Sequence, residues 1–224
     1  MKSELQASDV EIVETTTPYK GYFRIDRYLL RHRLFEGGWS RTMMREVFER
    51  GHAATALLYD PDLDAVVLIE QFRIGACVAT STPWHDKNFS PWLIECVAGI
   101  IEEGETPEQV IHRESMEETG CRVTDVLPIH RYMVSPGGTT ETVMLYCARV
   151  DASNAGGIHG LTEEHEDIRV LVVPAAEAIA WLDQGKLVNA MAIIAIQWMK
   201  LNHARVRSEW RGKGARQGKK PGPV

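Results

Sequence analysis

The sequence lacks the features that would indicate a membrane, secreted or disulfide-stabilised protein. No apolar run approaches the ~20 residues that a membrane-spanning helix needs. The polar, acidic N-terminus has no apolar segment of the kind found in secretory signals. The four cysteines are widely spaced, without a CxxC pair or a histidine at metal-ligand spacing, which indicates reduced thiols. We therefore expect a cytoplasmic protein without a membrane partner.

Acidic residues outnumber basic ones, but the excess is unevenly distributed. The 224 residues include 31 Asp and Glu and 25 Lys and Arg, which gives a net charge of −6. Residues 205–224 hold seven Lys or Arg and one acid, so the remainder carries −12. An acidic body argues against nucleic-acid binding. Because the end of this basic tail shows no apolar periodicity, we expect residues 205–224 to be disordered.

The pattern of apolar residues changes along the chain and shows no internal repeat. In residues 10–50, apolar and charged side chains alternate as in half-exposed antiparallel strands, and we expect residues 1–50 to form an N-terminal β-domain. Residues 51–204 combine apolar strand-like segments, such as 92–99, with helical segments near 174–184 and 188–201. The pattern predicts a second domain of the α/β (α+β) class.

The clearest helix is predicted to begin at Pro107. Thr106 is suited to the N-cap, proline to the first helical position and Gln109 to the capping box. Gly120 supplies the stop signal at the C-terminal end. The sequence therefore fixes the phase of this helix, and with it the side chains that share a face.

Acidic side chains gather on one face of the predicted helix. Glu114 and Glu118 are four residues apart, which places them ~6 Å apart along the axis, with Glu117 beside them. Such like charges disfavour a helix unless a cation lies between them, and Mg²⁺ or Mn²⁺ prefers carboxylate oxygen. Arg113 can pair with Glu105 and hold the preceding loop against the helix. A solvated acidic face is the alternative, but the preceding strand, the cap and the glycine stop favour a metal site.

The stretch from Gly99, GIIEEGETPEQVIHRESMEETGC, resembles the Nudix box, GX5EX7REUXEEXGU, whose enzymes hydrolyse a nucleoside diphosphate linked to another moiety. Ser115 departs from it, because this packing position usually holds a bulky aliphatic residue. The segments FERGHAA, VVLIEQFRI, SPGGTTE and GIHGL-x-EEHEDIRV extend the resemblance to the bacterial ADP-ribose pyrophosphatases over roughly residues 10–202. The resemblance implies a Nudix αβα sandwich on a mixed sheet, with an N-terminal β-domain exchanged between the subunits of a homodimer.

The resemblance also implies roles for individual residues. Mg²⁺, for which Mn²⁺ may substitute, would bind as two or three ions per site. Its ligands would be the Ala98 carbonyl, Glu114, Glu118 and Glu166, with Glu117 in support. The catalytic residues would be Glu164, as the general base, and Glu118, through the metal it holds. Structural positions of the box are Gly99, Glu105, Arg113 and Gly120. Substrate-binding positions are Tyr22 and Phe23 at the adenine, Arg45, Glu46, Arg50 and Arg73 near the base and diphosphate, and Ile100, Ser135, Gly137 and Glu141 at the ribose.

The expected number of metal ions requires a second group of acidic residues. Two or three ions need more carboxylates than one helix face offers, and residues 163–167, EEHED, form the other dense cluster. Its position in a glycine-containing loop, 151–166, suits a lid. The alternatives are an exposed acidic turn here, surface ion pairs for the arginines, and core or interface aromatics for Tyr22 and Phe23.

The resemblance thus implies a metal-dependent hydrolase that splits ADP-ribose into AMP and ribose 5-phosphate. The first alternative is the same chemistry on another nucleoside diphosphate sugar, such as GDP-mannose. The second is a Nudix-fold ligand sensor that binds without hydrolysis. Such sensors typically lose the carboxylates of the box, all of which are present in this sequence.

Overall fold

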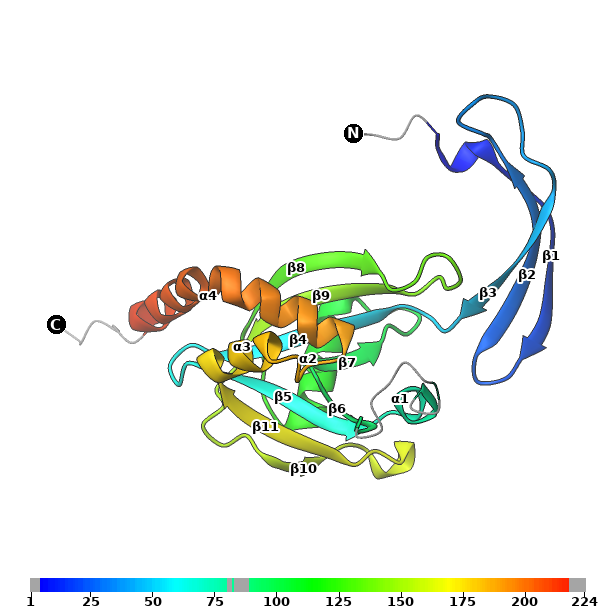
Figure 1. Ribbon diagram of the computed structural model, residues 1–224. Coiled ribbons are helices and arrows are strands. Elements are labelled where there is room, and N and C mark those ends of the chain that lie inside the picture. Colours follow the sequence, from blue (N-terminus) through cyan, green and yellow to red (C-terminus); the bar gives the residue numbers. More distant parts are fainter. Residues whose placement is uncertain (1–4, 80–81, 83–88, 218–224) are drawn as a thin grey trace. The chain divides into compact units, whose positions relative to one another are not determined.

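The computed structural model describes residues 5–79, 82 and 89–217 and divides the chain into two units (Figure 1). Residues up to His52 form the first unit together with Tyr132–Val143, and Ala53–Arg131 and the residues from Met144 onward form the second. The expected boundary at residue 50 lies close to this division, but the sequence did not indicate that a later segment joins the first unit. None of the described helices is long and apolar enough to cross a membrane.

The first unit is an antiparallel sheet in the order β1-β2-β3. Its strands are β1 (Val10–Lys20), β2 (Arg24–His32) and β3 (Met43–Glu49), preceded by a short 3₁₀ turn, η1 (Ala7–Asp9). All eleven residues of β1 are exposed, and β1 is an edge strand. The alternation of charged and apolar residues therefore predicted the strands of this unit correctly.

The second unit is built on an eight-stranded mixed sheet. Six strands run in the order β10-β11-β5-β4-β9-β8, while β6 pairs with β5 and β7 pairs with β4. The bounds are β4 (Ala53–Asp60), β5 (Ala65–Phe72), β6 (Trp92–Glu95), β7 (Val97–Ile100), β8 (Asp125–Met133), β9 (Thr142–Arg149), β10 (Gly157–His159) and β11 (Ile168–Pro174).

Helices cover both faces of this sheet. They are α1 (Ile74–Ala79), α2 (Pro107–Thr119), α3 (Ala175–Asp183) and α4 (Ala190–Gln217). Every residue of β4 is buried, and successive residues of a strand point to opposite faces. Leu58 belongs to the core that α2 completes with Val110 and Ile111, while the ring of Tyr59 lies 6.1 Å from that of Trp210 on α4. The α+β class and the αβα layering agree with the prediction.

One predicted strand is divided in two. Residues 92–99 were expected to form a single strand, but Cys96 separates β6 from β7. The two pieces have different partners, β6 pairing with β5 and β7 with β4. Apolar content cannot reveal such a change, because both pieces are partly or fully buried.

The expectation of disorder from residue 205 is wrong for residues 205–217, which continue α4. Val206 and Trp210 are buried one turn apart, and Arg207 pairs with Asp64 at 2.9 Å. The many basic residues concealed these apolar anchors in the sequence. Residues 218–224, to which the expectation also applied, lie outside the described residues.

Candidate metal and substrate site

The predicted cap and stop of α2 are confirmed. The Thr106 hydroxyl accepts a hydrogen bond from the Gln109 amide at 3.3 Å, and the Gln109 side chain accepts one from the Thr106 amide at 2.7 Å. Gly120 ends the helix with φ 68°, in the left-handed region that favours glycine. Both ends of the helix are therefore fixed, which fixes the direction of its acidic face.

Arg113 joins the loop before α2 to the acidic face. Its Nε and Nη2 donate to the two carboxylate oxygens of Glu105 at 3.1 and 3.2 Å, as the sequence predicted. Its Nη1 donates to Glu114 at 2.7 Å and to Glu117 at 3.1 Å. These hydrogen bonds raise the pKa of Arg113, Glu105 contributing most, and they lower the pKa of Glu105. One guanidinium thus orients three carboxylates.

Strand β7 lies directly against the acidic face of α2. A Cβ atom on Gly99 would lie 1.8 Å from Oε1 of Glu114, so any larger residue at this position would displace the Glu114 carboxylate. The neighbouring Ala98 amide donates to Oε2 of Glu118 at 3.2 Å. The structure therefore brings three of the predicted metal ligands, Ala98, Glu114 and Glu118, into one place. Ile100 follows them at the end of β7 and is partly exposed.

Burial and mutual repulsion make the two main carboxylates weak acids. Desolvation raises the pKa of Glu114 to about 7, opposed by Arg113 and reinforced by the charges of Glu117 and Glu166. Desolvation also raises the pKa of Glu118 well above its ordinary value; Glu114 and Glu166 add to the rise. Glu118 is only 3% exposed. A bound cation would relieve the repulsion between these groups.

The acidic loop contributes Glu166 to this cluster. The charge of Glu166 contributes to the raised pKa of both Glu114 and Glu118, and its Oε2 accepts a hydrogen bond from the Leu161 amide at 3.1 Å. Gly160 has φ 104°, and a Cβ atom there would lie 2.6 Å from Cβ of Glu166. This glycine therefore allows the close turn that directs Glu166 inward.

Glu164 lies apart from the cluster. The loop is more ordered than the sequence indicated, because it contains β10 and a 3₁₀ turn, η2 (Thr162–Glu164). Glu164 ends this turn with an exposed side chain, and its amide donates to the Leu161 carbonyl at 3.0 Å. The predicted base, Glu164, thus lies on a short exposed turn, two residues before Glu166 in the loop.

The charges of the same carboxylates act on Arg73, whose hydrogen-bond partner, Glu95, was not predicted from the sequence. Its Nε and Nη2 donate to one oxygen of buried Glu95, at 3.0 and 2.8 Å. Burial alone would lower the pKa of Arg73, but the charges of Glu95, Glu118 and Glu166 raise it. The available signal was a charged residue inside the apolar segment WLIECVAG, since a buried carboxylate needs a partner.

The remaining predicted substrate residues belong to the first unit, and several of them form one cluster. The Phe23 ring lies 4.8 Å from that of Tyr22, which is 87% exposed, and 5.0 Å from that of Phe48. Arg50 lies over the Phe23 ring at 5.9 Å and pairs with buried Glu141 at 3.5 Å. An exposed aromatic ring beside a fixed guanidinium can stack on a planar ligand.

Other predicted residues of this unit have partners of their own. Arg45 donates to the Met44 carbonyl at 2.8 Å, and Glu46 pairs with Arg27 at 2.8 Å. The Ser135 carbonyl accepts hydrogen bonds from two amides of the turn that contains Gly137. Surface ion pairs and an ordinary tight turn, without any role in substrate binding, would show the same contacts.

The donor set fits hard divalent cations. Carboxylate and carbonyl oxygens predominate, without cysteine or histidine ligands, which suits Mg²⁺ or Mn²⁺. Within the described part of the chain, no three acidic, histidine or cysteine side chains are already arranged around a common point. Arg113 and the Ala98 amide hold oxygens of Glu114 and Glu118 instead.

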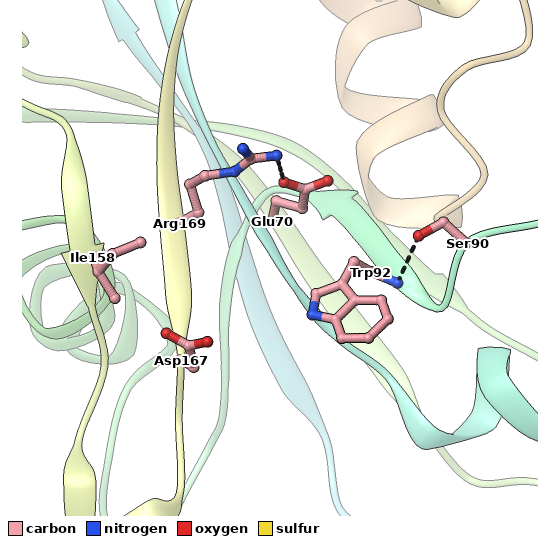
Figure 2. Close-up of a pocket in the computed structure, with 6 residues that line it drawn as sticks. All are labelled: Glu70, Ser90, Trp92, Ile158, Asp167 and Arg169. Atoms are coloured by element: carbon pink, nitrogen blue, oxygen red, sulfur yellow. Dashed lines mark hydrogen bonds and ion pairs between the residues drawn. The ribbon is translucent and has the colours of Figure 1, made fainter.

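A separate pocket of about 400 Å³ contains none of the predicted site residues (Figure 2). Asp167 and Arg169 alternate along the chain with Ile168 and Val170, which are buried in the core beneath α2. The pocket therefore opens on the other face of β11. Its lining is Glu70, Ser90, Trp92, Ile158, Asp167 and Arg169.

Comparison with known proteins shows which family and which enzymes the chain resembles. The family model described as "NUDIX domain" matches residues 49–192. An ADP-ribose pyrophosphatase of Escherichia coli (strain K12) is 48% identical over 91% of this chain and 93% of its own. One from Haemophilus influenzae is 42% identical over 93% and 95%. A GDP-mannose pyrophosphatase of Pectobacterium atrosepticum is 36% identical over 93% and 100%.

The raised carboxylate pKa values predict how stability depends on pH and on divalent cations. The pKa of Glu114 is higher in the folded protein than its ordinary 4.5, so its contribution to stability is present below about pH 4.5 and is lost as the pH rises through about 7. Added Mg²⁺ should therefore raise the melting temperature more at pH 8 than at pH 6. At a hundred-fold excess over Kd, we expect roughly 5 to 10 °C at pH 8. Differential scanning fluorimetry measures both.

Glu118→Gln is the matched variant, because it removes one of the repelling charges without changing side-chain volume. Without added ions it should melt at a higher temperature than the unchanged protein at pH 8. In this variant, added Mg²⁺ should also raise the melting temperature much less than in the unchanged protein. An equal Mg²⁺ effect in both proteins would contradict a cation site at these carboxylates.

Proposed function

The chain belongs to the NUDIX domain family, and on that premise we propose that it hydrolyses the diphosphate of ADP-ribose to AMP and ribose 5-phosphate. The observation that carries the proposal is the group of mutually repelling carboxylates formed by Glu114 and buried Glu118 on α2 with Glu166 of the acidic loop, whose charges also act on Arg73. The identity to ADP-ribose pyrophosphatases over more than nine-tenths of the chain supports this substrate.

GDP-mannose is the second candidate substrate. The GDP-mannose pyrophosphatase of Pectobacterium atrosepticum also covers most of the chain, though at the lower identity of 36%. The same diphosphate chemistry would serve GDP-mannose, since the two substrates differ in base and sugar. A ligand sensor without activity is disfavoured, because the acidic positions of the box are intact and Arg113 orients them.

Divalent cations are a general requirement of this family. We propose Mg²⁺, with Mn²⁺ able to replace it, at two or three ions per site. The ligands would be the Ala98 carbonyl and the carboxylates of Glu114, Glu118 and Glu166, with Glu117 in support. When bound, such ions screen the diphosphate charge and stabilise the leaving oxygen.

The chain itself would position water and take up a proton. In the proposed reaction a water oxygen attacks one phosphorus, the bridging P–O bond breaks, and Glu164 accepts the proton of the water. Glu164 lies on a short turn beside Gly160, so a modest movement of the acidic loop would bring it to the substrate. Arg73 would bind a diphosphate oxygen with its planar guanidinium.

Residues of the first unit would recognise the rest of the substrate. We propose that Tyr22 and Phe23 stack on the adenine, an interpretation supported by the exposed Tyr22 ring and by Arg50 above Phe23. The remaining contacts rest on the resemblance: Arg45, Glu46 and Arg50 near the base and diphosphate, and Ile100, Ser135, Gly137 and Glu141 at the ribose.

The protein's wider setting follows from its charge and its thiols. The acidic body disfavours nucleic acid as a partner. Cys96, Cys121 and Cys147 are buried without a disulfide, which fits a reducing, cytoplasmic environment. A homodimer is proposed because β1 is an exposed edge strand with apolar side chains at Val10, Ile12, Val13 and Tyr19.

The substrate proposal predicts the outcome of a substrate panel. With Mg²⁺, ADP-ribose should give the highest kcat/KM among nucleoside diphosphate sugars, with AMP and ribose 5-phosphate as the products. Chromatography after hydrolysis in ¹⁸O water identifies the products and the phosphorus attacked. A higher kcat/KM for GDP-mannose would reassign the substrate.

The proposed base predicts a difference between neighbouring acids. Glu164→Gln should lower kcat by about 10²- to 10⁴-fold, because the water loses its proton acceptor, while KM changes little. Glu163→Gln is the matched control on the same turn and should keep kcat within a few-fold. Steady-state kinetics at saturating Mg²⁺ separates the two. Equal losses in both variants would argue for a general effect of loop charge.

The dimer proposal predicts a molar mass near twice 25.2 kDa in solution. Light scattering coupled to size exclusion measures it directly. Ile12→Lys, which places a charge on the exposed edge strand, should shift the population toward the single chain. A monomer at micromolar concentration in the unchanged protein would refute the proposal.

A further inference from the structure

A buried carboxylate lies behind Arg73 at the end of β6. Glu95 is 4% exposed and receives hydrogen bonds from three side chains. Its Oε2 accepts from Arg73 and, at 3.4 Å, from Nε2 of Gln71, while its Oε1 accepts from Nδ2 of Asn189 at 2.8 Å. Both oxygens are thus engaged, which a buried charge requires.

The position of Glu95 is fixed by the start of α4. The Oδ1 atom of Asn189 accepts hydrogen bonds from the amides of Met191 and Ala192, at 2.9 and 3.2 Å, and so caps the helix. Its Nδ2 must therefore point away from the helix, toward Glu95. The cap cannot rotate without losing both bonds, so helix α4 holds the carboxylate in place.

Arg73 is also influenced by the charges of other carboxylates. Its side chain is 46% exposed, and its charge interacts with those of Glu118 and Glu166. A long, cationic side chain beside such acids would pair with them directly if nothing else held it. That pairing would occupy the oxygens that the proposed metal ions need. Glu95 instead holds the guanidinium by its Nε–Nη2 edge, which also fixes the plane of the group.

We propose that Glu95 is a positioning residue, which holds Arg73 away from the metal-site carboxylates and orients it toward the diphosphate. The inference rests on the proposed function, since it assumes that Arg73 binds the diphosphate. It assigns a role to a residue outside the box, and it links the reaction to the start of α4 through Asn189. In this role Glu95 acts through Arg73 and not on the substrate itself.

A double-mutant cycle on the full chain tests this role. Glu95→Gln should lower kcat/KM for ADP-ribose about 10- to 100-fold and raise the Mg²⁺ concentration needed for half-maximal rate, because the released Arg73 competes with the ions. In an Arg73→Ala background, Glu95→Gln should change either quantity by less than about two-fold. Full additivity of the two losses, or an unchanged Mg²⁺ requirement in Glu95→Gln, would overturn the proposal.

Glu70→Gln is the matched control. Glu70 also belongs to an ion pair across neighbouring strands, with Arg169, and lies in the pocket on the other face of β11 (Figure 2). Its replacement should leave kcat/KM and the Mg²⁺ requirement unchanged. A loss equal to that of Glu95→Gln would mean that any ion pair of this sheet has the same effect, which contradicts the proposal.

A second variant separates positioning from folding. Glu95→Gln places an amide opposite the Asn189 amide, which can destabilise the fold. Combining it with Asn189→Asp restores a donor–acceptor pair and keeps a helix cap. The unfolding midpoint in urea should then return toward that of the unchanged protein, while kcat/KM stays low. Recovery of kcat/KM together with stability would assign Glu95 a structural role only.

The proposed function and this inference fail in different ways. If ADP-ribose is not the preferred substrate, the cycle is measured with the nucleoside diphosphate sugar that the panel identifies, because the inference concerns the diphosphate. If Arg73→Ala keeps full kcat/KM, the diphosphate role of Arg73 is wrong and the inference falls with it. If Arg73→Ala lowers kcat/KM and the cycle is additive, only the inference is wrong.

Discussion

Repulsion between carboxylates held out of water is the constraint on which the second unit depends. Glu114 and Glu118 lie on one face of α2, and burial raises the pKa of both. Such an arrangement is unfavourable for the fold by itself, because each charge loses hydration and meets a like charge. A cation bound between these groups would relieve the same repulsion, so the cost to folding and the proposed metal binding would have one physical origin.

The surrounding structure holds these groups at close range. Gly99 removes the Cβ atom that would collide with Glu114, and the Ala98 amide holds Glu118 against β7. Arg113 orients the acidic face through Glu105, which belongs to the loop rather than to the helix. The glycines at 99 and 160 thus serve close approach, and α2 is fixed by contacts at its start, its middle and its end.

Cations of the chain itself could neutralise the site in place of a metal. Arg113 and Arg73 lie beside the cluster, and each is held by a carboxylate of its own, Glu105 and Glu95 respectively. Arg113 also donates to Glu114 and Glu117, so it neutralises part of the acidic face directly, whereas Arg73 is hydrogen-bonded to Glu95. The pairing with Arg73 explains why a buried acid such as Glu95 is tolerated in an apolar strand.

Local spacing in the sequence was sufficient to predict several features of the site. The cap at Thr106, the stop at Gly120, the pairing of Arg113 with Glu105 and the shared face of Glu114 and Glu118 follow from helix geometry, which repeats every 3.6 residues. Tertiary structure decided what distant segments do together. It divided residues 92–99 between two partner strands, anchored residues 205–217 as helix through Trp210, and joined Glu95 to Arg73 and Asn189. These outcomes depend on which surfaces meet after folding, and a linear pattern of apolar and charged residues does not specify contacts between positions almost a hundred residues apart.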